Sequence, residues 1–326
     1  MRIDFYRDSK PIEIITAFNS LSASLKWRGA GSFELQIANR DIYRNLQIKT
    51  DFLLINGEGY LLENKTKSDT KDERSYILSG RHINALLSWR VSEGISVAAG
   101  ENYEDIAAKL INDNFINPTD NKRKVSNLVI KNNGITKTAA ESYELEAMGV
   151  EEMMNKLLSY GDLGYHLSYD VENEQFVFEV LEGRDLSSTI VFGSKYNNIA
   201  EIEIYEESED YKNVGYSFAD GATNVYGEQS LIAWQRREMV SNGDNASDAL
   251  AKAKEVLGAN FEVKQNAQYL YEVDYKLGDK VSFIDYESNL QSVRAILEVE
   301  QFWEETHDIA LTFGDNRPTI IDKLKK

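Results

Sequence analysis

The chain has 326 residues and a formal net charge of −18, with 54 acidic and 36 basic residues. It has no cysteine, which excludes a disulfide framework, a cysteine-ligated zinc site and a thiol nucleophile. The acid excess argues against tight binding to nucleic-acid phosphates, because such binding needs clustered Lys and Arg. No apolar run approaches the length of a membrane span and the N-terminus lacks an apolar leader, so we expect neither stable membrane insertion nor a signal peptide.

The first segment, residues 1–92, is predicted to be mostly β-strand. A charged connection is expected over residues 64–74, and a short helix over residues 83–89. We interpret the segment as a small β-barrel or curled sheet closed by that helix. Strands are expected near residues 3–6, 12–15, 21–27, 33–37, 51–57, 59–63 and 76–79, with a Gly-rich turn between the runs 51–57 and 59–63.

Residues 93–188 have a different pattern and are predicted to form an α/β insertion domain. Apolar residues repeat at helical spacing over residues 102–115 and again over residues 150–160. Gly161 is expected to terminate the second helix as its C′ residue. A hairpin is predicted from two strand-like runs around residues 165–169 and 176–180.

Residues 189–326 return to strand patterns and are predicted to form a second β-barrel domain. A helix is expected over residues 246–257, begun by Asn245 as N-cap and stopped by Gly258. The last third is predicted to be an antiparallel meander, with Gly278 and Asp279 in the turn before its first strand. Its three runs are residues 271–286, 293–299 and 308–314. In the second run, alternation puts four apolar residues on one face, namely Val293, Ala295, Leu297 and Val299.

Six landmarks in this order resemble a siphophage and prophage tail hub family. They are residues 27–35 (WRGAGSFEL), 80–90 (GRHINALLSWR), 116–120 (INPTD), 210–214 (DYKNV), 275–281 (YKLGDKV) and the ending from residue 311. Members of that family are similar to the central hub of contractile tails. The resemblance implies an α+β, mainly β fold, with two small β-barrels and an α/β insertion. It also implies a homotrimer, whose six barrels form a pseudo-sixfold ring around a channel.

The resemblance also implies partners and a location. The hub stacks on the distal tail or tail tube ring protein, and its other face carries a spike, fibre or receptor-binding protein, or the end of the tape-measure protein. We therefore expect a baseplate hub at the virion tail tip, assembled in the host cytoplasm. DNA is expected to pass through during ejection without specific binding. The charge itself leaves two interpretations open: acidic side chains that face the channel and keep the duplex from adhering, or an acidic outer surface that only keeps the protein soluble.

Residues with catalytic or ligand chemistry do not form a motif. The histidines His82, His166 and His307 are not at metal-ligand spacing in the sequence. Glu304 and Glu305 beside His307 are interpreted as a polar hairpin loop, and the acidic run 206–210 lacks the pattern of a calcium loop. We expect no catalytic, cofactor-binding or metal-binding residue, no cofactor and no enzymatic activity.

Two other classes remain open on the sequence. Some hub proteins carry a peptidoglycan hydrolase, so the chain could be a tail-associated lysin or the hub domain of one, which a zymogram would reveal. A β-rich module with exposed Trp and Tyr could instead bind carbohydrate, which glycan-array binding would support.

Overall fold

The computed structural model describes residues 1–69, 74–207, 212–219, 222–227, 230–241, 256–263, 269–287, 290–304 and 306–313. Contacts divide the chain into two units, one of residues 1–201 with 261–312, the other of residues 202–260 with 313–326. The described residues are mainly β-strand, as the sequence predicts.

The first sheet of the larger unit has the strand order β2-β1-β5-β6. Asn56 and Gly57 connect β5 to β6, and both have positive φ (50° and 89°). Positive φ at both central residues defines the type I′ turn, and Asn-Gly is its preferred sequence. The turn leaves Glu58 as the first residue of β6. The four strands are β1 (Ile3–Arg7), β2 (Lys10–Ile15), β5 (Asp51–Ile55) and β6 (Glu58–Leu61).

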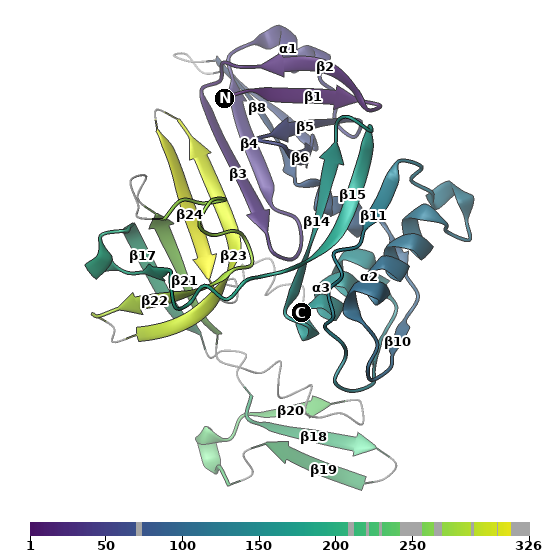
Figure 1. The fold of residues 1–326 in the computed structure, drawn as a ribbon, viewed down its shortest axis with the longest axis vertical. Helices are drawn as coiled ribbons and strands as arrows, with labels where there is room; N and C mark the ends of the chain where they lie inside the picture. Colours follow the sequence, from purple (N-terminus) through teal and green to yellow (C-terminus); the bar gives the residue numbers. More distant parts are fainter. Residues whose placement is uncertain are drawn as a thin grey trace. The chain divides into compact units, whose positions relative to one another are not determined.

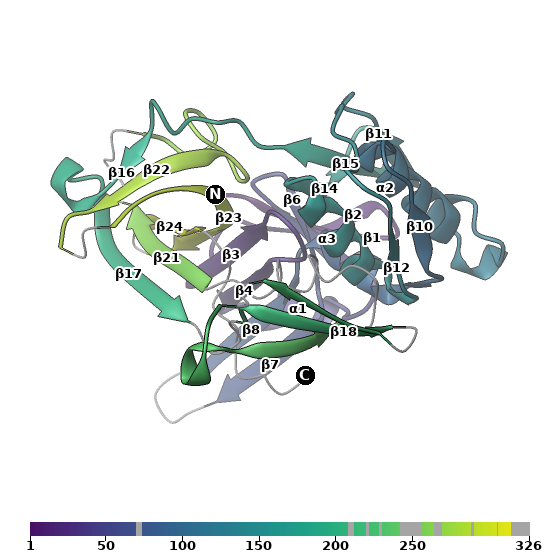
Figure 2. The same cartoon turned by 90° about the horizontal axis from the view of Figure 1, so that it is seen from below.

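The largest sheet joins strands of the first segment to strands of the last third. Within the larger unit its order includes β24-β23-β3-β4-β8-β7, so β23 from the last third pairs with β3 from the first. The strand β22 pairs with β23 and runs parallel to the short β16 (Figure 2). The strands are β3 (Ser20–Lys26), β4 (Ser32–Ile37), β7 (Asn64–Asp69), β8 (Arg74–Arg81), β16 (Val191–Phe192), β22 (Lys280–Asp285), β23 (Leu290–Trp303) and β24 (His307–Phe313).

Among the described residues no sheet closes into a barrel. The predicted pair of barrels, and the domain boundaries at residues 92 and 188, therefore stay predictions. One hydrophobic cluster includes Phe52 and Leu87 from the first segment with Leu157 and Phe178 from the insertion. These two segments thus share a buried core.

The predicted meander is present, because β22, β23 and β24 are neighbours in the sheet. The predicted buried face of its second run is wrong. Val293 is 48% exposed, whereas Ile296 and Val299 are buried. The reason is that β23 pairs with β22 over residues 290–295 and with β3 over residues 298–303. The buried side of the strand changes between these two ladders.

The helices of the insertion form where the sequence predicts them. Helix α2 (Tyr103–Ile111) begins at Asn102, whose side chain accepts hydrogen bonds from the backbone N–H groups of Glu104 and Asp105. A π-helical turn, η2 (Asn112–Ile116), follows it. Helix α3 (Val150–Tyr160) buries an apolar face that includes Met153 and Leu157.

Helices α2 and α3 lie beside the three-stranded sheet β11-β15-β14 (Figure 1). Its strands are β11 (Leu128–Lys131), β14 (Leu163–Asp170) and β15 (Gln175–Glu182). The shorter elements of this region are β9 (Val91–Ser92), β10 (Ile95–Val97), η3 (Asn121–Arg123), β12 (Tyr143–Leu145) and β13 (Met148–Gly149).

The end of α3 corrects one expectation. Gly161 has a φ of −90°, and the left-handed conformation is taken by Asp162 instead. A Cβ on Gly161 would lie 2.7 Å from Cδ2 of Tyr103. Glycine is thus suited to this position by close packing on α2.

In the first segment the sequence missed helix α1 and strand β7 and misjudged the helix after β8. Helix α1 (Arg40–Asn45) buries none of its residues, so it has no apolar stripe to reveal it. Strand β7 occupies part of the expected charged connection, because it pairs along β8 at a sheet edge. The helix at residues 83–89 is a 3₁₀ helix, η1 (Ile83–Trp89), capped by His82.

The second unit contains a three-stranded sheet of order β19-β18-β20. Most of the predicted helix 246–257 lies outside the described residues, and its last two residues begin β21. Among the described residues no helix combines the length and hydropathy of a membrane crossing. The remaining elements are η4 (Ser194–Tyr196), β17 (Ile199–Glu207), β18 (Val214–Ala219), β19 (Ala222–Gly227), η5 (Ala233–Gln235), β20 (Glu238–Ser241) and β21 (Val256–Val263).

Candidate functional site

Three side chains with ligand chemistry meet inside the larger unit. Glu58 begins β6, His82 caps η1, and His166 lies in β14. The Nε2 atoms of His166 and His82 lie 3.0 Å and 3.4 Å from Oε2 of Glu58. The two imidazole rings stack with centroids 5.2 Å apart. The fold thus brings together two of the three histidines, which are 84 positions apart in the sequence.

The hydrogen bonds of His82 fix the position of its proton. The backbone N–H of Asn84 donates to Nδ1 of His82 over 3.2 Å, which makes Nδ1 an acceptor. A neutral His82 therefore carries its proton on Nε2, facing Glu58. The side chain of His82 is 1% exposed, whereas those of His166 and Glu58 are 19% and 27% exposed. The cluster is thus closed on the His82 side and reachable on the other.

Burial and hydrogen bonding act in opposite directions on the three groups. Burial raises the pKa of Glu58, but hydrogen bonds from His166 and His82 outweigh it and hold that pKa well below its ordinary value. Burial lowers the pKa of His166, but the bond to Glu58 outweighs burial and raises it. At His82 burial prevails and lowers the pKa. His166 is therefore the more basic histidine of the pair.

The side chain of Asn84 ties the cluster to its surroundings. It donates to the carbonyl of Gly29 over 2.9 Å and accepts from the backbone N–H of Leu167 over 2.8 Å. Asn84 is 1% exposed, so neither backbone group has water as an easy alternative partner. One side chain thus joins the β3–β4 loop, η1 and β14.

We expect Asn84→Ala to lower the free energy of unfolding by about 1–3 kcal/mol, because it leaves a buried carbonyl and a buried N–H without a partner. The measurement is urea unfolding followed by circular dichroism. Asn121→Ala, at an exposed residue of η3, is the control and should change stability by less than about 0.5 kcal/mol. Equal effects of the two variants would contradict the assigned role of Asn84.

Trp27 connects two of the sequence landmarks. The residue is 3% exposed, and its ring lies against Gly164 of β14 and Gly278 of the turn before β22. A Cβ on Gly164 would lie 2.4 Å from Cδ2 of Trp27, and one on Gly278 would lie 2.3 Å from Cζ3. The backbone of Trp27 also bonds to Leu297 and to Tyr165. The landmarks around residues 27 and 278 are therefore in direct contact.

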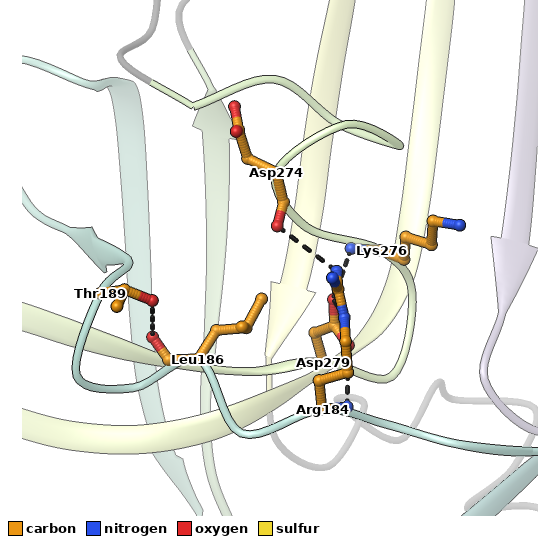
Figure 3. A network of polar contacts seen from close by, with 6 residues as sticks. All are labelled: Arg184, Leu186, Thr189, Asp274, Lys276 and Asp279. Atoms are coloured by element: carbon orange, nitrogen blue, oxygen red, sulfur yellow. Dashed lines mark hydrogen bonds and ion pairs between the residues drawn. The ribbon is translucent and has the colours of Figure 1, made fainter.

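Asp279, in the same turn, is the centre of a polar network (Figure 3). Its carboxylate accepts from Nη2 of Arg184 at 2.6 Å and from the backbone N–H groups of Arg184 and Lys276 at 2.9 Å and 2.8 Å. The side chain of Asp279 is 4% exposed and that of Arg184 is 51% exposed. The turn predicted at Gly278 and Asp279 is confirmed, and the carboxylate of Asp279 anchors the connection that follows β15.

The other candidates from the sequence are found apart from the cluster. His307 is exposed, and its ring stacks on Trp303. Its Nε2 lies 3.1 Å from Oε1 of Gln301. Glu305 and residues 208–210 of the acidic run lie outside the described residues. Met153 and Met154 are buried in the core, as predicted. Sequence spacing could not reveal the cluster, because its members come from three separate elements.

The fold is similar to those of three solved tail proteins. The fold matches a tail protein from Neisseria meningitidis (TM-score 0.61, 16% identity, 96% of both chains). It matches a 43 kDa tail protein of prophage MuSo2 from Shewanella oneidensis (TM-score 0.59, 11% identity, 96% of this chain and 97% of that one). It also matches the prophage tail protein gp18 from Listeria monocytogenes (TM-score 0.58, 15% identity, 100% and 98%). The chain therefore has the fold of phage tail proteins.

A family model covers nearly the whole sequence. Residues 7–315 match the family described as Siphovirus ReqiPepy6 Gp37-like protein, and the chain belongs to that family. The resemblance to siphophage tail hub proteins is thereby confirmed. No curated protein sequence matches the chain significantly.

Proposed function

We propose that this protein is the trimeric baseplate hub of a phage or prophage-derived tail tip, joining the tail tube to a spike or fibre. The observation that carries the proposal is the match of the whole fold, over 96–100% of the chain, to three proteins described as tail proteins. These relatives favour a structural role over the hydrolase alternative. The family match over residues 7–315 supports the same assignment.

The surface of the first sheet supports assembly with further protein. Strand β2 is at the edge of that sheet and exposes Ile12 and Ile14, which are 39% and 47% accessible. An edge strand with exposed apolar side chains is unfavourable in an isolated chain and favours contact with a neighbour. A ring of three copies stacked on a tail tube ring would provide such neighbours.

In this proposal the ring encloses the channel through which DNA leaves the virion. The chain carries an excess of 18 negative charges, so acidic side chains on the channel wall would repel the phosphates. The duplex would then pass without stable binding, and the tape-measure protein would end at the same hub.

The test is the mass of the assembly. We expect three copies of the chain when it is co-expressed with the distal tail protein of the same phage and measured by native mass spectrometry. The chain purified alone is the comparison, since ring closure can depend on the tail ring. Six copies or one copy in a reconstruction of the tail tip would contradict the trimer.

A further inference from the structure

We propose that Glu58, His82 and His166 form a binding site for a divalent first-row transition metal ion such as Zn²⁺. One oxygen and two imidazole nitrogens, all within 4.8 Å of one another, converge from β6, the cap of η1 and β14. A ligand set of two imidazoles and one carboxylate favours such ions over Ca²⁺ and Mg²⁺. The inference is independent of the proposed tail role.

The distances support this ligand set. Metal bonds of about 2.1 Å place neighbouring ligand atoms roughly 3.0 Å apart in an octahedral site and about 3.4 Å apart in a tetrahedral one. The observed separations from Oε2 of Glu58 to Nε2 of His166 and of His82 are 3.0 Å and 3.4 Å. An ion can therefore replace the shared protons after small rotations of the side chains.

Access and surroundings also suit an ion. His166 and Glu58 keep some exposure, which provides an entry route, while the fully buried His82 forms the floor. The ring of Tyr60 packs edge-on against His82 at 5.2 Å and shields it from water. Three protein ligands leave at least one coordination position for water, as in open zinc sites.

The hydrogen bond from Asn84 limits the affinity. Binding through Nε2 requires His82 to carry its proton on Nδ1, and the bond from the backbone N–H of Asn84 is then lost. An acceptor for the second ring N–H of a ligating histidine raises metal affinity about 10–100-fold. Among the described residues His82 has no such acceptor, because the backbone N–H of Asn84 faces its Nδ1. We therefore infer that Glu58 and His166 provide most of the binding and that His82 completes the set.

The consequence of binding would be structural. The ion would link the first segment, through Glu58 and His82, to the insertion, through His166. A ligand that binds only the folded state raises its stability in proportion to the logarithm of its concentration above Kd. Zn²⁺ should therefore raise the thermal transition of the whole chain.

The experiment uses the full chain without a polyhistidine tag, after treatment with EDTA. We expect Zn²⁺ to bind with one-to-one stoichiometry by isothermal titration calorimetry and to raise Tm, and Co²⁺ to give visible absorption bands. Mg²⁺ and Ca²⁺ should do neither. Glu58→Gln and His166→Gln should each weaken Zn²⁺ binding by at least about 10-fold.

The matched control is His307→Gln, which removes the histidine outside the cluster and should leave Zn²⁺ affinity unchanged. Both cluster variants change partly exposed side chains, and circular dichroism of the metal-free forms checks their folding. His82→Gln is avoided because His82 is fully buried. Absence of one-to-one binding to the wild-type chain would overturn the proposal, as would equal affinity in wild type, Glu58→Gln and His166→Gln. The cluster would then hold protons only.

Discussion

Gly278→Ala is expected to lower the free energy of unfolding by about 2–5 kcal/mol. Gly278 has a φ of +88°, a conformation that costs an L-residue about 1–2 kcal/mol. The new Cβ would also lie 2.3 Å from the ring of Trp27. That ring cannot move aside, because Gly164 contacts it as well, and overpacking in such a core costs about 1–3 kcal/mol. Urea unfolding measures the sum.

Gly57→Ala separates the two contributions. Gly57 has nearly the same φ, +89°, but no atom lies within 4 Å of where its Cβ would be. Gly57→Ala should therefore lower the free energy of unfolding only by the backbone strain of about 1–2 kcal/mol.

A double substitution tests the contact with the ring. Gly278→Ala combined with Trp27→Leu should cost less than the sum of the single changes, since the smaller side chain gives space. Additive effects, or equal effects at both glycines, would show that Trp27 does not restrain Gly278.

Local sequence was sufficient where an element is defined by its own residues. Asn56 and Gly57 specify their hairpin turn through the positive φ that both adopt. Helix α3 follows from apolar spacing alone, because its buried face is continuous. The turn at Gly278 and Asp279 was predictable because glycine and aspartate themselves favour turns.

Local sequence was insufficient where distant segments meet. Strand β23 pairs with β3, and the period-two pattern of one strand contains no information about this partner. The change of buried side between Val293 and Val299 follows from that pairing. The Glu58 cluster depends likewise on how β6, η1 and β14 pack. Its sequence signal was weak, because Glu58 and His82 lie at the ends of elements whereas His166 lies inside β14.

The turn at Asp279 should also depend on its partner Arg184. Asp279→Ala is expected to cost about 2–4 kcal/mol, because it removes a buried carboxylate that satisfies two backbone N–H groups as well as the guanidinium. Arg184→Ala alone should cost about 1.5–3 kcal/mol, the range of hydrogen bonds to charged groups. A double-mutant cycle in urea measures both and their coupling.

The two substitutions should not be additive. In the Asp279→Ala background the guanidinium of Arg184 keeps, among the described residues, only a 3.4 Å contact with the carbonyl of Asp274, so Arg184→Ala should then have almost no effect. The control is Lys156→Ala, which breaks an ion pair with Glu152 at 2.8 Å. Those side chains are 43% and 60% exposed, so the change should cost only about 0.3–0.5 kcal/mol. If Arg184→Ala cost no more than Lys156→Ala, burial of the carboxylate would not strengthen the pair. The turn would then depend on the backbone bonds of Asp279 alone.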